Sequence, residues 1–259
     1  MASARESEFK KKMKALMSEV DRLGDESVKR SLTLLNAARK EIAAQIASTE
    51  WDAYYLPKLK EAVERAMIEF GEKYGVDLRT VLADFWDLGI ARANIPLETL
   101  GVETMVPSVN IKALEIAQGY SSDLIGNLSR DAIKKINEAL ADGILGQKTP
   151  FEVMKAIGKN LDDPSVFKSI AARAEVITRT ETGRIFEMAT QLRLEEAEKI
   201  IGKKIQKQWQ SSGKPTGRPY HQAVDGQIRD IDEPFEVGGE RLMYPGDPSG
   251  SAWNTINCG

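Results

Sequence analysis

Apolar residues recur every three or four positions along most of the first 200 residues, the spacing that places them on one face of an α-helix. One stripe follows Asp25, a plausible N-terminal cap, and a second begins near Pro57 and closes at Gly75, which suits a C-terminal cap. The stripes are Val28, Leu32, Leu35, Ile42 and Ile46, and then Leu59, Val63, Ala66, Phe70 and Tyr74. The pattern predicts two separate amphipathic helices.

The same pattern continues through the middle of the chain. Asp77 is placed to cap a third helix, which Pro96 ends, and its buried face is Leu78, Val81, Leu82 and Phe85. Shorter helices bounded by Gly, Pro, Ser or Asp are predicted over 108–118, 121–141 and 150–159. No fixed-period repeat is visible in the sequence.

One long helix is predicted from Asp163 to Ile201, because Asp163-Pro164 supplies a cap and a first-turn proline. Its apolar stripe is Phe167, Ile170, Ala174, Ile177, Ile185, Met188 and Leu192. We expect a helix of this length to support the packing of other elements.

After Gly202 the pattern changes, because KKIQKQWQ alternates and glycines and prolines crowd the remainder. The stretch Val237 to Leu242 predicts a hairpin, with Gly238-Gly239 suited to the positive φ angles of its turn. The predicted class is mainly α with a small C-terminal β/loop module (α+β). It has an extended helical N-terminal part, residues 1–160, and a C-terminal region, residues 161–259, whose long helix packs against the module.

Composition narrows the class of protein further. The 259 residues are 42% apolar and 29% charged, with a net charge of −3. No run approaches the roughly 18 apolar residues of a membrane span, and the N-terminus has no apolar signal core, so we expect no membrane partner and a cytoplasm-like compartment. Because Cys258 and His221 are single residues of their kinds, an intrachain disulfide framework and an ordinary closed zinc site are excluded.

Glu181 interrupts the apolar stripe of the long helix, since it shares a face with Ile177 and Ile185. A carboxylate there must be paired, because an isolated buried charge costs several kcal/mol. Arg184 is the local partner, and Arg218 or His221 are possible partners from the module. An acid–base role remains an alternative, but we favour a structural clasp that holds the module to the helix.

The only histidine, His221, lies four residues before Asp225 in RPYHQAVDGQ. Turn formers flank the pair, so a shared helical face is not expected. A His-Asp pair suits base catalysis, but no nucleophile motif such as G-x-S-x-G accompanies it. We favour a structural histidine, and we predict no catalytic residue, no metal site and no cofactor. The absence of a P-loop, a dinucleotide fingerprint and H-E-x-x-H agrees with this.

A basic stretch surrounds Trp209 and contains Lys203, Lys204, Lys207 and Lys214. Lysines near an aromatic ring can follow a phosphate backbone while the ring stacks on a base. A solvated face beside a buried tryptophan is more common. Nucleic-acid binding therefore remains an unspecific alternative for these lysines.

Several short motifs occur in a fixed order in the C-terminal region. They are Arg173 to Thr182, Lys207-Gln-Trp209, His221-x-x-x-Asp225-Gly226, Asp232-Glu-Pro-Phe235, Tyr244-Pro-Gly-Asp-Pro248 and Ile256-Asn-Cys258. This series resembles the phage Mu F-like minor head protein family. The matched positions are Arg179, Thr180, Glu181, Trp209, His221, Asp225, Gly226, Pro245, Gly246, Asp247, Asn257 and Cys258.

The resemblance implies a minor protein of phage head morphogenesis that is not an enzyme. It would bind the portal inside the assembling capsid, in several copies, and be packaged or ejected with double-stranded DNA. Scaffold or major capsid protein are further implied partners. The expected location is the virion, near the portal, and the host cytoplasm during assembly. One departure is that such proteins usually continue from Asn-Cys to a second cysteine, whereas this chain stops at Cys258-Gly259.

Two other classes of function remain open from the sequence. Mu F-like modules also occur joined to toxin domains, so a toxin or modifying enzyme is the second hypothesis. The module stands at the end of this chain, which favours the assembly role. A DNA-binding protein that acts through the lysines around Trp209 is the third hypothesis.

Overall fold

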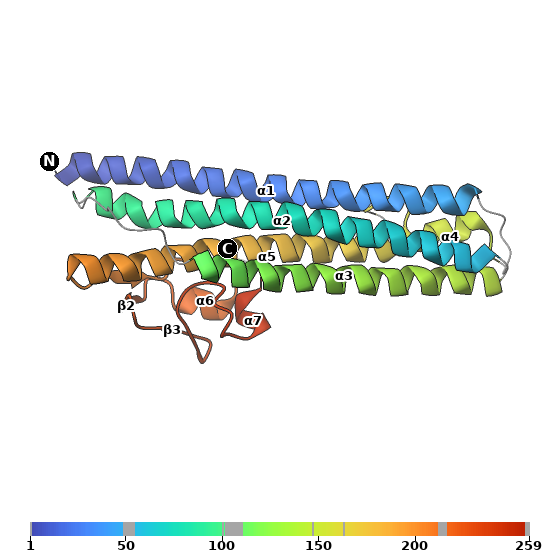
Figure 1. Ribbon diagram of the computed structural model, residues 1–259. Helices are drawn as coiled ribbons and strands as arrows, with labels where there is room; N and C mark the ends of the chain where they lie inside the picture. Colours follow the sequence, from blue (N-terminus) through green and yellow to red (C-terminus); the bar gives the residue numbers. More distant parts are fainter. Residues whose placement is uncertain are drawn as a thin grey trace. The chain divides into compact units, whose positions relative to one another are not determined.

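Long α-helices make up most of the described chain, and the strands lie near the C-terminus (Figure 1). The computed structural model describes residues 2–48, 55–99, 101, 111–146, 148–162, 164–211 and 217–256. The longest helices are α1 (Ala2–Ser48), α2 (Leu56–Thr99), α3 (Ile111–Leu145) and α5 (Val166–Ile201). Shorter helices are α4 (Pro150–Ile157), α6 (Pro219–Ala223) and α7 (Ala252–Thr255). The mainly α class with a small β/loop module is thereby confirmed.

Several predicted helix boundaries are wrong, because the helices run through them. Asp25 lies inside α1 and is therefore not an N-terminal cap, while Gly75 and Asp77 both lie inside α2. Asp77 instead accepts a hydrogen bond from Arg30 Nε at 2.9 Å. The buried row of α2 continues from Tyr74 to Leu78, so apolar packing outweighs the local cost of a helical glycine.

Two further boundaries shift for related reasons. Pro96 lies inside α2, which ends three residues later at Thr99. Proline removes only one backbone hydrogen-bond donor from a helix. The residues after Pro96 therefore still continue α2 for a short distance, and the predicted C-terminal end of the helix lies too early in the sequence. The helices expected over 108–118 and 121–141 meet in α3, of which residues 111–145 are described.

The predicted long helix and the helix near residue 150 are confirmed. α5 spans Val166–Ile201; Asp163, its expected cap, lies outside the described residues. α4 begins after Thr149, whose hydroxyl accepts from the Glu152 amide while the Glu152 carboxylate accepts from the Thr149 amide. This capping box, with Pro150 in the first turn, starts the helix locally.

The chain forms two compact units, each assembled from separate stretches. Unit 1 comprises Met1–Gly24, Val81–Ala117 and Arg179–Gly259, and unit 2 comprises Asp25–Thr80 and Gln118–Thr178. The predicted domains, 1–160 and 161–259, stay a prediction.

Unit 2 is a packing of helix segments joined by buried polar contacts. The Tyr74 hydroxyl lies 2.8 Å from both the Ala174 carbonyl and the Thr178 hydroxyl. Gly71 allows α2 to approach α3 closely, because a Cβ at this position would lie 2.5 Å from Ser129 Oγ. The Tyr74 contacts and the Gly71 approach join α2 to α5 and α3 within this unit.

In unit 1, α2 and α5 approach so closely at Gly89 that a Cβ there would lie 2.3 Å from the Phe186 carbonyl oxygen. Thr190 Oγ1 donates to the Gly89 carbonyl at 3.0 Å, and Arg193 Nε donates to Asn94 Oδ1 at 2.8 Å. The face of α5 toward α2 is therefore held by close packing together with specific hydrogen bonds.

The strands form two antiparallel pairs in the C-terminal module, which we define as residues 203–256. β1 (Gln206–Gln208) pairs with β2 (Ile228–Asp230), and β3 (Phe235–Val237) pairs with β4 (Glu240–Leu242). The predicted hairpin is confirmed, with φ of 58° at Gly238 and 83° at Gly239. Each strand has only three residues, so the pairs depend on side-chain packing for stability.

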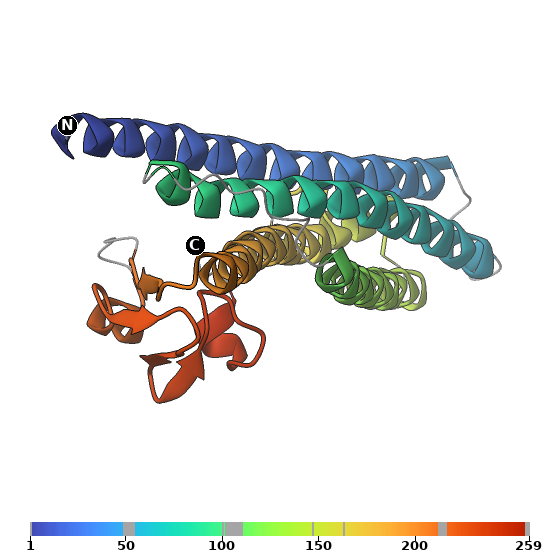
Figure 2. The ribbon, with the colours of Figure 1, turned by 60° about the vertical axis from the view of Figure 1, so that its left-hand side comes forward.

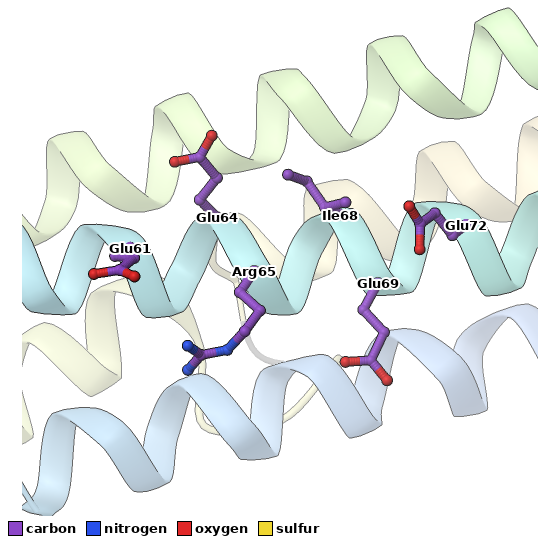
Figure 3. Close-up of a pocket in the computed structure, with 6 residues that line it drawn as sticks. All are labelled: Glu61, Glu64, Arg65, Ile68, Glu69 and Glu72. Atoms are coloured by element: carbon purple, nitrogen blue, oxygen red, sulfur yellow. The ribbon is translucent and has the colours of Figure 1, made fainter.

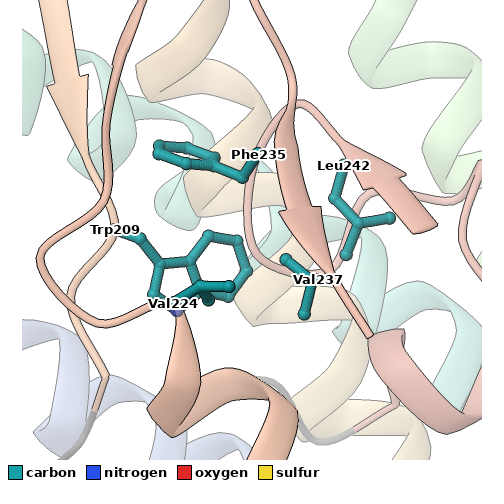
Figure 4. Close-up of a cluster of buried hydrophobic side chains, with 5 residues drawn as sticks. All are labelled: Trp209, Val224, Phe235, Val237 and Leu242. Atoms are coloured by element: carbon teal, nitrogen blue, oxygen red, sulfur yellow. The ribbon is translucent and has the colours of Figure 1, made fainter. Parts of the chain in front are cut away.

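That packing is a small aromatic cluster inside the module (Figure 4). Its members are Trp209, Val224, Phe235, Val237 and Leu242. The rings of Trp209 and Phe235 meet edge to face with centroids 5.2 Å apart. The cluster consists of module residues, so the module has a core of its own.

Candidate functional site

The Glu181 carboxylate is 1% exposed and pairs with Arg184, one turn further along α5, at 3.0 Å. Arg184 Nε also donates to the carbonyl oxygen of Gly246 in the module, at 3.2 Å. Gly246 has φ of 79°, and a Cβ on it would lie 3.5 Å from the Arg184 Cα. The guanidinium thus links the buried carboxylate of the helix to the module.

Gln191, two turns further along α5, makes the next link. Its Nε2 donates to the Ile231 carbonyl at 2.7 Å and to Glu195 Oε1 at 2.7 Å. Its Oε1 accepts from Lys207 Nζ at 3.3 Å. Glu198 follows, and its Oε2 accepts from the Ile205 amide at 2.7 Å.

These α5 residues, Glu181, Arg184, Gln191, Glu195 and Glu198, share one helical face by their separations of three, seven, four and three. Sequence reasoning found only Glu181 and Arg184 and missed Gln191, Glu195 and Glu198. The sequence does contain a signal for these three residues. Polar residues recur at helical spacing along a helix that was expected to be a packing surface for other elements.

Lys207 lies in β1, and its ammonium group makes three hydrogen bonds inside the protein. Besides Gln191 Oε1, it donates to the carbonyls of Ile231 at 3.0 Å and Met243 at 2.9 Å. It also lies 5.2 Å from the centre of the Phe235 ring. Burial lowers the pKa of the Lys207 amine to about 8. The Lys207 amine therefore makes internal hydrogen bonds. The sequence had favoured a solvent-exposed side chain at this position.

The other lysines of the basic stretch have different surroundings. Lys203 is exposed, and Lys204 lies 3.3 Å from Asp232 and 3.5 Å from Glu198. Lys214 lies outside the described residues. Lys203 is therefore the lysine of this group that is exposed and makes no ion pair within the described part of the chain.

His221 lies in α6 and Asp225 follows the end of that helix, so the two residues do not share a helical face, as expected. Its ring meets Trp209 edge to face with centroids 5.6 Å apart. Burial and the charge of Arg218 lower the His221 pKa, while hydrogen bonding to Asn254 raises it. The ring is half-buried within the module, and the Arg218 guanidinium donates to the Ile256 carbonyl.

Asp225 and Gly226 lie in the turn after α6, and this turn is hydrogen-bonded to the chain around Trp209. Asp225 Oδ1 accepts from the Ser211 amide at 2.6 Å. The Trp209 amide donates to the Gln227 carbonyl, and the Gly226 amide donates back to the Trp209 carbonyl, both at 2.9 Å. Gly226 has φ of 78°, which explains a glycine at this motif position.

Asp247 organises the loop after β4. It is 6% exposed, and its carboxylate accepts from the amides of Met243 at 2.7 Å and Ser249 at 2.9 Å. Burial and Asp247 raise the pKa of the neighbouring Tyr244 hydroxyl. Pro245 lies in this loop between them. The Tyr244 to Pro248 motif is a backbone-bonded turn that presents the Gly246 carbonyl to Arg184.

The remaining motif positions are divided between the helix and the chain end. Thr180 is buried on α5, whereas Arg179 is exposed. Asn257 and Cys258 lie outside the described residues.

Hollows on the described part of unit 2 include two that contain none of these motif residues. One, of about 500 Å³, is lined by α2 side chains that point in different directions from the helix (Figure 3). The other, of about 850 Å³, lies between α1 and α2 and includes Leu34 and Val76. Among the described residues, no group of three or more His, Cys, Asp or Glu side chains is arranged to hold a metal ion. No helix in the described ranges is long and apolar enough to cross a membrane.

The fold and the site define a helical protein that carries a small β/loop module hydrogen-bonded to its last long helix. Residues 134–258 match the family model described as Phage Mu protein F like protein. This match confirms the resemblance to the Mu F-like family that the motifs of this C-terminal region indicate. At the level of the family, the match supports a protein of phage head morphogenesis and is consistent with a structural rather than a catalytic role.

The chain is also similar to part of a curated protein, the NAD(+)-arginine ADP-ribosyltransferase EFV of Enterococcus faecalis. The two are 38% identical over 82 residues, which is 32% of this chain and 16% of that relative. The chain thus matches about a sixth of the length of this relative. No solved structure matches the chain.

Proposed function

We propose that this protein is a minor head protein of a tailed phage that binds the portal inside the assembling capsid. The family match over residues 134–258 is the observation that carries the proposal. In this role the protein acts in the virion, near the portal, and in the host cytoplasm during assembly.

The helical part is the region we propose for contact with portal, scaffold or major capsid protein. At the start of α3 in unit 1, Ile111 is 56% exposed and Ile116 is 75% exposed. We propose that these side chains contact the partner, because the burial of exposed apolar surface stabilises an interface. Because a portal is a symmetric ring, several copies would bind equivalent positions around it.

Purification of proheads tests this function directly. The protein should co-purify with portal, and Ile116→Asp should reduce its amount in heads while leaving its fold intact by circular dichroism. Ile68→Asp is the matched control, since Ile68 is also exposed, at 45%, but lies on α2 in unit 2. Consistent absence of the wild-type protein from heads would exclude the proposal.

Association with packaged double-stranded DNA is a finer part of the proposal. Lys203 is suited to phosphate contact, whereas the Lys207 ammonium already makes three internal hydrogen bonds. Under this role, Lys203→Glu should weaken DNA retention, and the measured affinity should fall as salt is added. Retention that does not change with either would remove DNA from the list of partners.

A modifying enzyme is the second candidate function, and the similarity to the ADP-ribosyltransferase of Enterococcus faecalis is the observation that favours it. Incubation of the full chain with labelled NAD and an arginine-containing acceptor protein distinguishes the two. Transfer of label would support the enzyme. Absence of transfer, together with co-purification with portal, would support the head protein.

A further inference from the structure

The module lies beside the C-terminal half of α5 (Figure 2). Polar contacts along one face of that helix join the two. Arg184, Gln191 and Glu198 bond respectively to Gly246, Ile231 and Ile205. Lys207 completes the row from the module side through Gln191 Oε1. Three of the four module groups in these bonds belong to the main chain, so the row depends on the folded shape of the module.

The module does not need α5 for its aromatic cluster, which consists of Trp209, Val224, Phe235, Val237 and Leu242. Its two strand pairs are also internal, joining β1 to β2 and β3 to β4. The residues that fold the module and the residues that join it to α5 are therefore largely different sets.

The connection between the two is short and solvent-exposed. α5 ends at Ile201, and Gly202 follows with φ of 65° and no heavy atom within 4 Å of where a Cβ would lie. Lys203 and Lys204, which lead to β1, are exposed. A glycine at positive φ in open surroundings can change its dihedral angles without a steric clash.

We propose that the polar row is a latch, and that the module swings away from α5 about Gly202 as a folded unit. Hydrogen-bonded contacts exchange for contacts with water at small net cost, whereas opening the aromatic cluster exposes apolar surface to water. Release of the row therefore requires less free energy than unfolding of the module, which is how locally opening units behave in folded proteins.

Two classes of backbone amide report on these two events separately. The Ile205 amide donates to Glu198 Oε2 and is protected only while the module is docked. The Trp209 and Gly226 amides bond within the module and are protected while it is folded. We therefore propose to measure amide hydrogen exchange of the full chain residue by residue. The Ile205 amide reports undocking of the module, and the Trp209 and Gly226 amides report its unfolding.

In the wild-type chain, the Ile205 amide should exchange at least about tenfold faster than the Trp209 and Gly226 amides after correction for intrinsic rates. Gln191→Met should speed exchange at Ile205 by about three- to tenfold, the change expected for a lost buried hydrogen bond, with Trp209 and Gly226 unchanged. Thr190→Val is the matched control, because Thr190 is the adjacent residue but bonds to Gly89 on α2. It should leave exchange at Ile205 unchanged.

Two results would overturn the latch. One is equal exchange of the Ile205 and Trp209 amides in the wild-type chain, which would mean that the module and α5 open together. This comparison needs no substitution, so it holds even if a variant folds poorly. The other is a Gln191→Met variant whose Ile205 exchange equals that of Thr190→Val.

Discussion

Arg184 lies one helical turn after Glu181, and its guanidinium contacts both the Glu181 carboxylate, at 3.0 Å, and the Gly246 carbonyl of the module, at 3.2 Å. The pair is almost fully buried, with side-chain exposures of 10% for Arg184 and 1% for Glu181. Such a pair is costly to desolvate, but removal of one member leaves a buried charge without its partner. We therefore expect the free energy of unfolding to depend strongly on Glu181 and Arg184 as a pair.

Arg184→Met should lower the free energy of unfolding by about 3–5 kcal/mol, because the buried Glu181 carboxylate would lose its ion pair with Arg184. The double variant with Glu181→Met should cost less than the sum of the two single variants. Urea unfolding measures both. Arg173→Met is the control, since Arg173 pairs with Asp131 at 2.8 Å on an exposed surface and should change stability by less than about 1 kcal/mol. Equal effects at both arginines would contradict the prediction.

The Lys207 amine predicts a stability that rises with pH. Burial lowers its pKa to about 8 from 10.5, while the charges of Glu195 on α5, Asp232, Glu233 and Asp247 act in the opposite direction. The unfolded chain binds more protons than the folded chain between these two values, so stability rises across this window. Urea unfolding followed by tryptophan fluorescence at pH 7.5, 9 and 10 should show the rise.

Two lysine variants separate this effect from other titrations. Lys207→Met should reduce the rise, whatever its effect on stability at pH 7.5. Lys203→Met, at an exposed position four residues earlier, should keep the wild-type rise. A rise of the same size in Lys207→Met as in wild type would assign it to other groups.

His221 predicts a loss of stability in acid. Burial and Arg218 lower its pKa below 6.5, so the folded module favours the neutral ring. Its contribution is fully present above pH 6.5 and is lost as the pH falls through the folded value. His221 is the only histidine, so His221→Gln should flatten the dependence between pH 7 and 5 in urea titrations. An unchanged dependence would assign it to carboxylates.

Two glycines of α2 should respond in opposite directions to alanine. Gly89→Ala should destabilise by about 1–3 kcal/mol, because the new Cβ would lie 2.3 Å from the Phe186 carbonyl oxygen. Gly75→Ala meets no atom within 4 Å and should stabilise the helix by up to about 1 kcal/mol. Thermal unfolding of both variants measures the difference, and destabilisation of equal size would exclude the steric explanation.

The apolar spacing identified helical segments well but placed their ends poorly. Asp25 and Gly75 have the residue types of caps, yet the helices continue through both. Capping preferences amount to about 1 kcal/mol per site, and continuous burial of an apolar face outweighs them. Local signals decided the structure where backbone geometry alone was at stake, as at Thr149 before α4 and at Gly238-Gly239 in the hairpin.

The helical class, the change to a small β/loop module after Gly202, and the need for a partner at Glu181 can all be derived from the order of the amino acids alone. These follow from spacing and from the cost of burying a charge, which depend on nearby residues. The inward position of the Lys207 side chain, bonded to Gln191, Ile231 and Met243 instead of facing solvent, depends on long-range packing. Its acceptors lie 16 to 36 residues away along the chain, so no local pattern around Lys207 contains them.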